Sequence, residues 1–208
     1  MSATRVLSLG AVAYLIAGCS GMSEQACMTA DWRTVGFEDG TFGRSEANIG
    51  RYRQQCGEHG VAPDLASYRA GHADGVRIYC RESNGFAVGH SGATYQGVCP
   101  ADLEAAFVAE YNAGRQLNEL ESALRSVDAR IAGNYRAQEG IKEELTGIAA
   151  TMISADTTSE QRVAMVTRSA ELGRRYGELT NEIRDLERDR ALAERDLLDY
   201  RATLAATF

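Results

Sequence analysis

The stretch GFEDGTFG, residues 36–43, places three glycines in the pattern G-F-x-x-G-x-x-G, and the pattern returns as GFAVGHSG at residues 85–92. Two further motifs follow each stretch, namely Val-x-Pro at 61–63 and 98–100 and Tyr-x-Ala-Gly at 68–71 and 111–114. Because the motifs keep one order, we interpret them as two copies of a duplicated unit. The first copy holds an additional segment, residues 45–56.

Glycines at this spacing have two interpretations. A glycine-rich loop that binds a phosphate lies between a strand and a helix and usually has a lysine or an acidic partner downstream. Neither copy follows a strand-like apolar run, and the only lysine of the chain, Lys142, lies far from both. Glycines three or four residues apart also share one face of a helix, where missing side chains let a second helix approach. We therefore expect closely packed short helices, with aromatic residues beside the glycines: Trp32, Phe37, Tyr68, Phe86 and Tyr95.

The first residues have the pattern of an export signal. A positively charged start that includes Arg5 precedes an apolar run that is too short to span a bilayer. The run ends in LIAGC, residues 15–19, which resembles the bacterial lipobox and predicts lipidation of Cys19. An ordinary signal peptide followed by a chance cysteine is the alternative. We expect a signal peptide over 1–18 and a lipidated linker over 19–26, so that acyl chains on Cys19 anchor the protein to a membrane.

The expected location is the cell envelope. Ser20, rather than an aspartate, follows Cys19. By resemblance to enterobacterial sorting signals, this favours an outer-membrane lipoprotein that faces the periplasm. The formal net charge of −7 argues against a nucleic-acid partner.

Four further cysteines remain if Cys19 is lipidated, and an even number suits disulfides in an oxidising compartment. Pairing within each repeat, Cys27–Cys56 and Cys80–Cys99, is favoured because the segment between the first two can fold back as two helices. The symmetric alternative, Cys27–Cys80 with Cys56–Cys99, is almost equally compatible with the sequence.

Composition changes sharply after residue 100. Most of the glycines, both prolines and all five cysteines precede residue 101, which defines a Gly/Cys-rich helical repeat domain over 27–100. Residues 101–208 lack proline and cysteine, and acidic residues outnumber basic ones there. The two regions are therefore expected to have different architectures.

Long heptad patterns fill the second region and predict a coiled-coil hairpin over 101–208, with two antiparallel helices of about 45–50 residues each. The polar stretch SADTTSEQR, residues 154–162, would form the turn, with Thr157 and Glu160 as a capping box. The predicted seam residues are Leu117, Leu120, Leu124, Val127, Ile131, Asn134, Gln138, Ile141, Leu145, Ile148, Met152, Leu172, Tyr176, Leu179, Ile183, Leu186, Arg190, Ala193, Leu197, Tyr200 and Leu204. The fold class predicted is all-α: a small disulfide-stapled helical domain with two Gly-rich repeats, followed by a long antiparallel coiled-coil hairpin.

Two features of the hairpin are candidate partner contacts. Gly133, Gly140 and Gly147 lie seven residues apart at an outward position, although each glycine costs a helix roughly 1 kcal/mol relative to alanine. The stripe would let a partner helix approach closely, or it is merely tolerated. Met152 and Met165 lie near the turn, where adaptable methionines suit a binding surface or close the hairpin from within. The seam is also compatible with a homodimer of two hairpins.

No catalytic, cofactor-binding or metal-binding site emerges from the residues. The three histidines, with nearby Asp39, Asp74 and Glu58, match no metal-ligand spacing. Ser91 lies in GHSG, but a nucleophile elbow needs a glycine two positions after the serine. We therefore expect a protein that is not an enzyme. The histidines are His59, His72 and His90.

Three motifs in combination resemble a known family. They are DWRTVGFEDGTFG, C-x3-GVAPDLASYRAG-x3-G-x3-YC and NGFAVGHSG-x2-YQGVCP. Over about residues 27–117 they resemble an uncharacterised family of proteobacterial lipoproteins and exported proteins, domain of unknown function 2799. The resemblance implies an envelope location and cysteines within the domain, and it supplies no catalytic residues.

The function expected from these observations is structural. We expect a non-enzymatic envelope lipoprotein that acts as a structural or adaptor protein and binds another protein through its coiled-coil hairpin. The alternative is a periplasmic ligand-binding or inhibitory module, with Trp32, Phe37, Phe86 and Tyr95 around a pocket. An envelope hydrolase is a distant third possibility.

Overall fold

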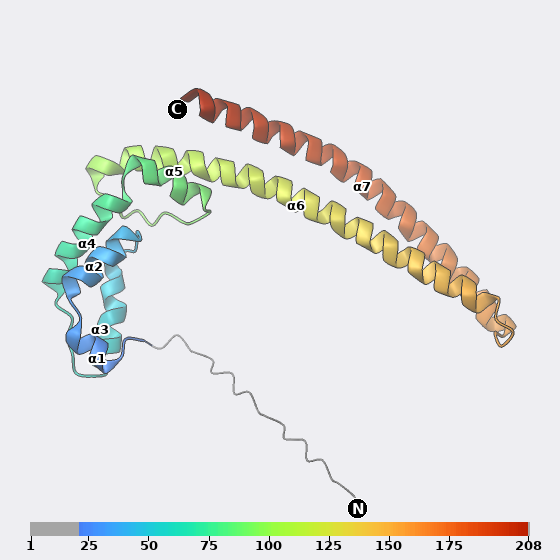
Figure 1. Ribbon diagram of the computed structural model, residues 1–208, viewed down its shortest axis with the longest axis horizontal. Helices are drawn as coiled ribbons and strands as arrows, with labels where there is room; N and C mark the ends of the chain where they lie inside the picture. Colours follow the sequence, from blue (N-terminus) through green and yellow to red (C-terminus); the bar gives the residue numbers. More distant parts are fainter. Residues whose placement is uncertain (1–20, 208) are drawn as a thin grey trace, which may run out of the picture. The chain divides into compact units, whose positions relative to one another are not determined.

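A computed structural model describes residues 21–207, which contain helices and no strand (Figure 1). The predicted signal peptide and Cys19 lie outside the described residues. The all-α fold class is confirmed for the part of the chain that is described. The helices are α1 (Glu24–Thr29), α2 (Trp32–Thr41), the 3-10 helix η1 (Glu46–Asn48), α3 (Ile49–Gly57), α4 (Leu65–Tyr79), α5 (Glu82–His90), α6 (Ala101–Met152) and α7 (Ser159–Thr207).

These helices pack into two units. The first unit contains α1 to α4 and the segment Gln96–Pro100, and the second contains α5, α6 and α7. The change in packing falls after Cys80, whereas the change in composition falls after residue 100. The two positions differ because α5, which carries the second Gly-rich stretch, packs on α6. The predicted repeat domain, 27–100, is thus shared between the units.

Two disulfides and a small aromatic core hold the first unit together. Cys27 of α1 is bonded to Cys56 of α3, and Cys80 at the end of α4 is bonded to Cys99. The pairing favoured from the sequence is therefore the one in the structure. Side-chain caps start the helices, since Asp64 accepts hydrogen bonds from two backbone N–H groups at the start of α4. The buried core residues around the first disulfide are Cys27, Trp32, Ile49, Cys56 and Tyr68.

Glycines bring α2 and α4 into backbone contact. A Cβ atom added to Gly36 would lie 2.0 Å from the carbonyl oxygen of Tyr68, and one added to Gly71 would lie 1.9 Å from that of Arg33. No side chain fits at such distances, so the glycines are required by the packing. The expectation that these glycines mediate close helix contact is confirmed.

The second repeat has the same packing between α5 and α6. A Cβ atom on Gly89 would lie 2.0 Å from the carbonyl oxygen of Tyr111, and one on Gly114 would lie 2.1 Å from that of Phe86. In the first repeat, Gly75 meets the carbonyl oxygen of Phe37 in the same way, at 2.1 Å. Phe37 and Phe86 occupy the same place in the G-F-x-x-G-x-x-G pattern. Gly114 is thus the structural equivalent of Gly75.

Matching the two Tyr-x-Ala-Gly motifs therefore misaligns α4 and α6 by one helical turn, compared with the alignment that the glycine contacts give. A shift of four residues keeps the same helix face, which is why the sequence pattern did not reveal it. In the structural alignment of the two repeats, Tyr68 is equivalent to Phe107, and both are fully buried. His72 is equivalent to Tyr111. The ring pairs stack alike, with centroids 6.0 Å apart in the first repeat and 6.4 Å in the second.

The hairpin consists of α6 and α7, which run antiparallel and meet at a tight turn (Figure 1). Every predicted seam residue is buried or half-buried, as a coiled-coil hairpin requires. Polar seam residues are bonded across it: the Gln138 amide donates to Thr180 Oγ1 at 2.8 Å, and Asn134 donates to Glu182 at 3.1 Å. Such pairs hold one register of the two helices.

The turn differs from the prediction by one residue. The capping box consists of Thr158 and Gln161, whose side chains each accept a hydrogen bond from the other residue's backbone N–H, at 2.8 and 3.2 Å. Thr157 instead donates its hydroxyl to the carbonyl oxygen of Thr151 at 2.6 Å and closes α6. The predicted pair, Thr157 and Glu160, was wrong because both pairs satisfy the same sequence pattern.

None of the helices within residues 21–207 has the length and apolarity that a membrane crossing demands.

Candidate functional site

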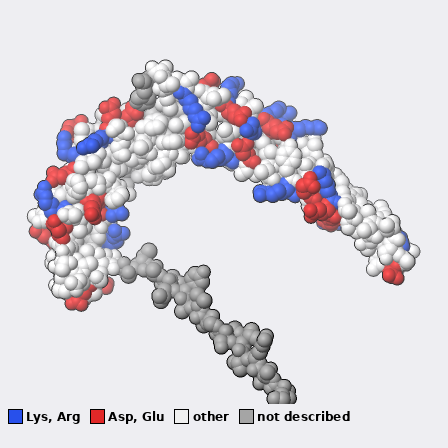
Figure 2. Space-filling model, in the orientation of Figure 1, with Lys and Arg blue, Asp and Glu red and all other residues white. Residues whose placement is uncertain are grey.

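The tip of the hairpin exposes apolar side chains. Ile153 is 86% exposed, Val163 68% and Val166 57%. Met152 and Met165, the predicted contact residues, are half-buried between them. Charged side chains of both signs follow each other along the hairpin in Figure 2, whereas its tip is mostly uncoloured. The tip thus combines apolar surface with low charge, the composition of a protein-binding surface.

Hydrogen bonds order the loop that carries Ile153 and leads to Val163 and Val166 in the first turns of α7. The Arg162 guanidinium donates to the carbonyl oxygen of Ser154 at 2.9 Å, across the loop. The capping box of Thr158 and Gln161 fixes the start of α7 on the other side. Because the loop is already ordered, a partner that binds it loses less conformational entropy.

The predicted glycine stripe lies on the open side of α6. A Cβ atom added to Gly133, Gly140 or Gly147 would meet no atom within 4 Å. Gly140 also lines a hollow of about 590 Å³, beside the ion pair of Glu144 and Arg168, whose closest atoms are 2.7 Å apart. The stripe is therefore free of internal packing, in contrast to the glycines of the repeats.

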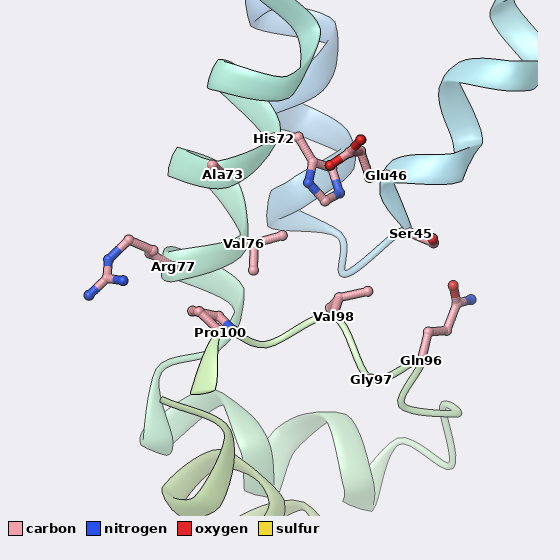
Figure 3. Close-up of a pocket in the computed structure, with 10 residues that line it drawn as sticks. All are labelled: Ser45, Glu46, His72, Ala73, Val76, Arg77, Gln96, Gly97, Val98 and Pro100. Atoms are coloured by element: carbon pink, nitrogen blue, oxygen red, sulfur yellow. The ribbon is translucent and has the colours of Figure 1, made fainter. Parts of the chain in front are cut away.

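The first unit holds a second hollow, of about 440 Å³ (Figure 3). Its walls are α4, the segment at Ser45 and Glu46, and Gln96–Pro100, which the Cys80–Cys99 disulfide ties to α4. In Figure 3, Val76, Val98 and Pro100 point into the hollow from different sides, while Arg77 points away. The lining combines an apolar floor with a few polar groups, which is the composition of a small-molecule site. The lining residues are Ser45, Glu46, His72, Ala73, Val76, Arg77, Gln96, Gly97, Val98 and Pro100.

In the first unit, Asp39 forms a buried hub, and only 1% of its surface is exposed. Its carboxylate accepts hydrogen bonds from four side chains: Arg44 at 2.7 Å, Asn48 at 2.5 Å, Tyr68 at 2.8 Å and Tyr52 at 3.2 Å. Burial raises the pKa of Asp39, but these donors together outweigh it and hold the pKa below its ordinary value. Burial, together with the bond to Asp39, raises the pKa of Tyr68. The second repeat has Val88 and Phe107 at the equivalent places, so the hub belongs to the first repeat alone.

At the base of the hairpin, Glu121 of α6 links three helices. Its carboxylate lies 3.0 Å from His90 Nε2 of α5 and accepts a bond from Arg201 of α7 at 2.7 Å. The bond with His90, and then the bond from Arg201, lowers the pKa of Glu121. The adjacent Tyr200 hydroxyl donates to the carbonyl oxygen of Ala113 at 2.9 Å. The last turns of α7 are thus fastened to the second repeat.

The other candidate residues have separate, structural partners. His59 is exposed, and the Nε2 atom of buried His72 lies 2.7 Å from the carbonyl oxygen of Arg44. Asp74 pairs with Arg33 at 2.5 Å, and Ser91 donates its hydroxyl to the carbonyl oxygen of Val88 at 2.8 Å. Within residues 21–207, no three His, Cys, Asp or Glu side chains are grouped so that they could hold a metal ion.

The four aromatic residues of the alternative hypothesis are divided between the two units. Trp32 is buried in the core of the first unit and Phe37 lies on the surface of that unit. Phe86 and Tyr95 belong to the second unit. None of the four lines the hollow beside His72. Sequence reasoning missed the residues that do line it, because most are small or ordinary residues contributed by three separate segments.

A comparison with known protein families finds a match over the repeats. Residues 31–116 match the family described as "Protein of unknown function (DUF2799)". No curated protein and no solved structure matches the chain. The matched range runs from the N-cap of α2 to the first turns of α6 and so contains both glycine-packed helix pairs. It confirms the resemblance to this family seen in the sequence motifs: residues 31–116 of this chain match the DUF2799 family model.

Proposed function

We propose that this protein is a non-enzymatic lipoprotein of the cell envelope that acts as an adaptor, binding another protein through its coiled-coil hairpin. The exposed apolar tip carries the proposal. Three branched aliphatic side chains are presented to solvent where helices of 52 and 49 residues meet: Ile153 lies in the loop, and Val163 and Val166 lie in the first turns of α7. Their exposure is a cost in solution that burial against a partner would remove.

The location rests on separate support. The lipobox-like end of the first segment predicts an anchor at Cys19 and, with Ser20, the outer membrane. Two disulfides, Cys27–Cys56 and Cys80–Cys99, are consistent with an oxidising compartment such as the periplasm. Replacement of Cys19 by alanine is expected to move the protein from the membrane fraction to the soluble fraction, and unchanged fractionation would contradict the anchor.

Site-specific photocrosslinking in living cells tests the adaptor function. A photoreactive amino acid replaces Ile153 at the tip and, as a matched control, Leu192, which is also an exposed aliphatic residue of the hairpin but lies far along α7. We expect a discrete heavier band from Ile153 that is absent from Leu192. The double variant Val163→Asp/Val166→Asp should reduce the adduct at least tenfold while helix content stays constant. Equal labelling at both positions, or no adduct from Ile153, would refute tip binding.

The hollow of about 440 Å³ in the first unit favours one alternative, a periplasmic ligand-binding or inhibitory module. Its ligand would place an apolar body against Val76, Val98 and Pro100. Native mass spectrometry of the protein isolated from its own periplasm would then reveal a bound small molecule. The variant Val98→Trp, which fills the hollow, should lose that mass, whereas Ile153→Asp should keep it.

A further inference from the structure

Both repeats leave a hollow at the same place beside their helix pair. By the alignment of α4 with α6 from their glycine contacts, His72 is equivalent to Tyr111. Val76, one turn further along α4, is equivalent to Arg115. The pair on α6 lines a hollow of about 280 Å³, and the pair on α4 lines the hollow of about 440 Å³. The hollow is therefore a feature of the repeated unit.

A bond that both repeats share shows which ring atom of His72 carries the hydrogen. In the second repeat, Tyr111 donates its hydroxyl to the carbonyl oxygen of Ala93 at 3.1 Å. In the first repeat, the Nε2 atom of His72 lies 2.7 Å from the carbonyl oxygen of Arg44, which follows the Gly-rich stretch just as Ala93 does. A carbonyl oxygen only accepts hydrogen bonds, so Nε2 carries the hydrogen. In the neutral ring, Nδ1 is therefore an acceptor.

The Nδ1 atom of His72 is an acceptor that the described residues leave unused. Only 7% of His72 is exposed, and its side chain forms no hydrogen bond with residues 21–207 besides the one to Arg44. Figure 3 shows the ring extending from α4 above Val76 and Val98, at one end of the hollow. No fully enclosed side-chain nitrogen or oxygen in this part of the chain lacks a partner, so Nδ1 is open to the hollow. A bound molecule can therefore donate a hydrogen bond to it.

The lining around this acceptor is apolar in the first repeat and charged in the second. Val76, Val98 and Pro100 point into the first hollow (Figure 3). In the second hollow, the place of Val76 is taken by Arg115, which is paired with Glu119 at 2.5 Å. The first hollow thus combines an apolar surface with a single buried acceptor, which suits a small apolar molecule with one polar group.

The carboxylate and the guanidinium in the lining of the first hollow do not offer a charge to a ligand. Glu46 is already paired with Arg69 at 2.6 Å. Arg77 points away from the hollow in Figure 3. An ion that entered the hollow would lose its hydration without gaining a countercharge. The hollow therefore favours an uncharged molecule.

We propose that the hollow of the first repeat binds an uncharged apolar molecule that carries a hydroxyl group. The hydroxyl donates its hydrogen to His72 Nδ1, and the apolar body lies against Val76, Val98 and Pro100. This inference rests on the ligand-binding alternative and deepens it by naming the class of ligand. It does not depend on the hairpin tip.

Two probes with the same two-ring body, 2-naphthol and naphthalene, test the role of the hydroxyl. Each is titrated by calorimetry into residues 21–208, which contain every described helix. We expect 2-naphthol to bind about tenfold more tightly, since one hydrogen bond separates the two probes. His72→Phe, which keeps a ring but removes the acceptor, should abolish this preference. The matched control His59→Phe, at an exposed histidine of the same unit, should retain it.

Further measurements keep the test decisive. Fluorescence of Trp32, the only tryptophan and a core residue of the first unit, shows whether each histidine variant is folded. In the parent protein, the nitrogen-15 NMR signal of His72 Nδ1 should move on addition of 2-naphthol and stay in place with naphthalene. Val98→Trp, which fills the hollow, should abolish binding of both probes.

The outcomes separate the two levels of the proposal. Equal affinities for the two probes, both lost in Val98→Trp, would overturn the hydroxyl class and leave the ligand-binding alternative in place. Absence of binding by either probe, or binding that persists in Val98→Trp, would overturn both.

Discussion

Glycine has opposite roles in the repeats and in the hairpin, although both regions pair α-helices. In the repeats, a Cβ atom on Gly36, Gly71 or Gly89 would collide with a backbone carbonyl oxygen of the facing helix. In the hairpin, a Cβ atom on Gly140 or Gly173 would meet nothing within 4 Å. The repeats are therefore held by backbones at close range, and the hairpin by the side chains of its seam.

This difference has a consequence for tolerance to substitution. Close backbone contact leaves no room to adjust, since moving one helix disturbs every contact along the pair. In the hairpin, the stabilising energy is spread over the many side chains of the heptad seam. The outer face of the hairpin contributes little to stability. Substitutions in the first repeat should therefore have the largest effects and those on the outer face of the hairpin the smallest.

The largest effect is expected from Gly71→Ala. The new methyl group would lie 1.9 Å from the carbonyl oxygen of Arg33, so α2 and α4 must separate. We expect the free energy of unfolding of the first unit to fall by about 3 kcal/mol, the upper end for overpacked cores. Urea unfolding of residues 21–208, followed by fluorescence of Trp32, measures this loss.

Gly50→Ala in α3 is the matched control for that experiment. It lies in the same unit and in a helix, but its Cβ would meet no atom within 4 Å. We expect no loss of stability and a gain of up to about 1 kcal/mol from helix propensity. Equal effects of the two substitutions would show that close backbone contact does not hold the first repeat together.

A smaller and pH-dependent effect is expected from Asp39→Asn. The pKa of Asp39 is lowered in the folded protein, so its contribution to stability is complete above the ordinary value of 3.8 and is lost as the pH falls below it. At pH 7, the variant should lose about 1–3 kcal/mol, because hydrogen bonds to an ionised, buried carboxylate are replaced by weaker ones. The difference between variant and parent should shrink as the pH falls below 3.8.

Unfolding of both proteins by urea at a series of pH values, again followed by Trp32, measures this prediction. The second repeat supplies a control, since Val88→Asn places the same amide at the equivalent position, where no carboxylate hub exists. Because Val88 lies in the second unit and Trp32 in the first, the unfolding of this variant is followed by circular dichroism at 222 nm. Its effect should be independent of pH between 3 and 7. A constant difference between Asp39→Asn and the parent over this range would rule out the carboxylate as the source of the stability.

The features that sequence reasoning could predict are those that repeat locally. Heptad spacing placed every seam residue from Leu117 to Leu204 correctly, because a long apolar stripe has only one way to be buried. The glycine spacing predicted close helix contact for the same reason. The pairing of Cys27 with Cys56 was favoured but not decided, since a symmetric alternative fitted almost as well.

The features that it could not predict depend on contacts between distant segments. Asp39 belonged to no recognisable site motif in the sequence, and the donors from Arg44, Asn48, Tyr52 and Tyr68 converge on it only once four elements have packed. The alignment of the two repeats from their sequences was off by one helical turn. The two Tyr-x-Ala-Gly motifs lie on the same helix face, although they are not equivalent in the structure. The hollow beside His72 has no sequence signal, because the Cys80–Cys99 disulfide brings its last wall from a separate loop.

The smallest effect, and the one that separates stability from binding, is expected from Gly140→Ala on the outer face of the hairpin. Alanine should stabilise α6 by up to about 1 kcal/mol, because its methyl group meets no atom and its helix propensity is higher. Gly173→Ala on α7 is the matched control, with the same open surroundings. Circular dichroism at 222 nm, which mainly reports the hairpin, should show both gains during urea unfolding.

If the glycine stripe contacts a partner, Gly140→Ala should weaken the adduct formed at Ile153 while Gly173→Ala leaves it unchanged. Equal adducts from both variants would show that the stripe is tolerated rather than used.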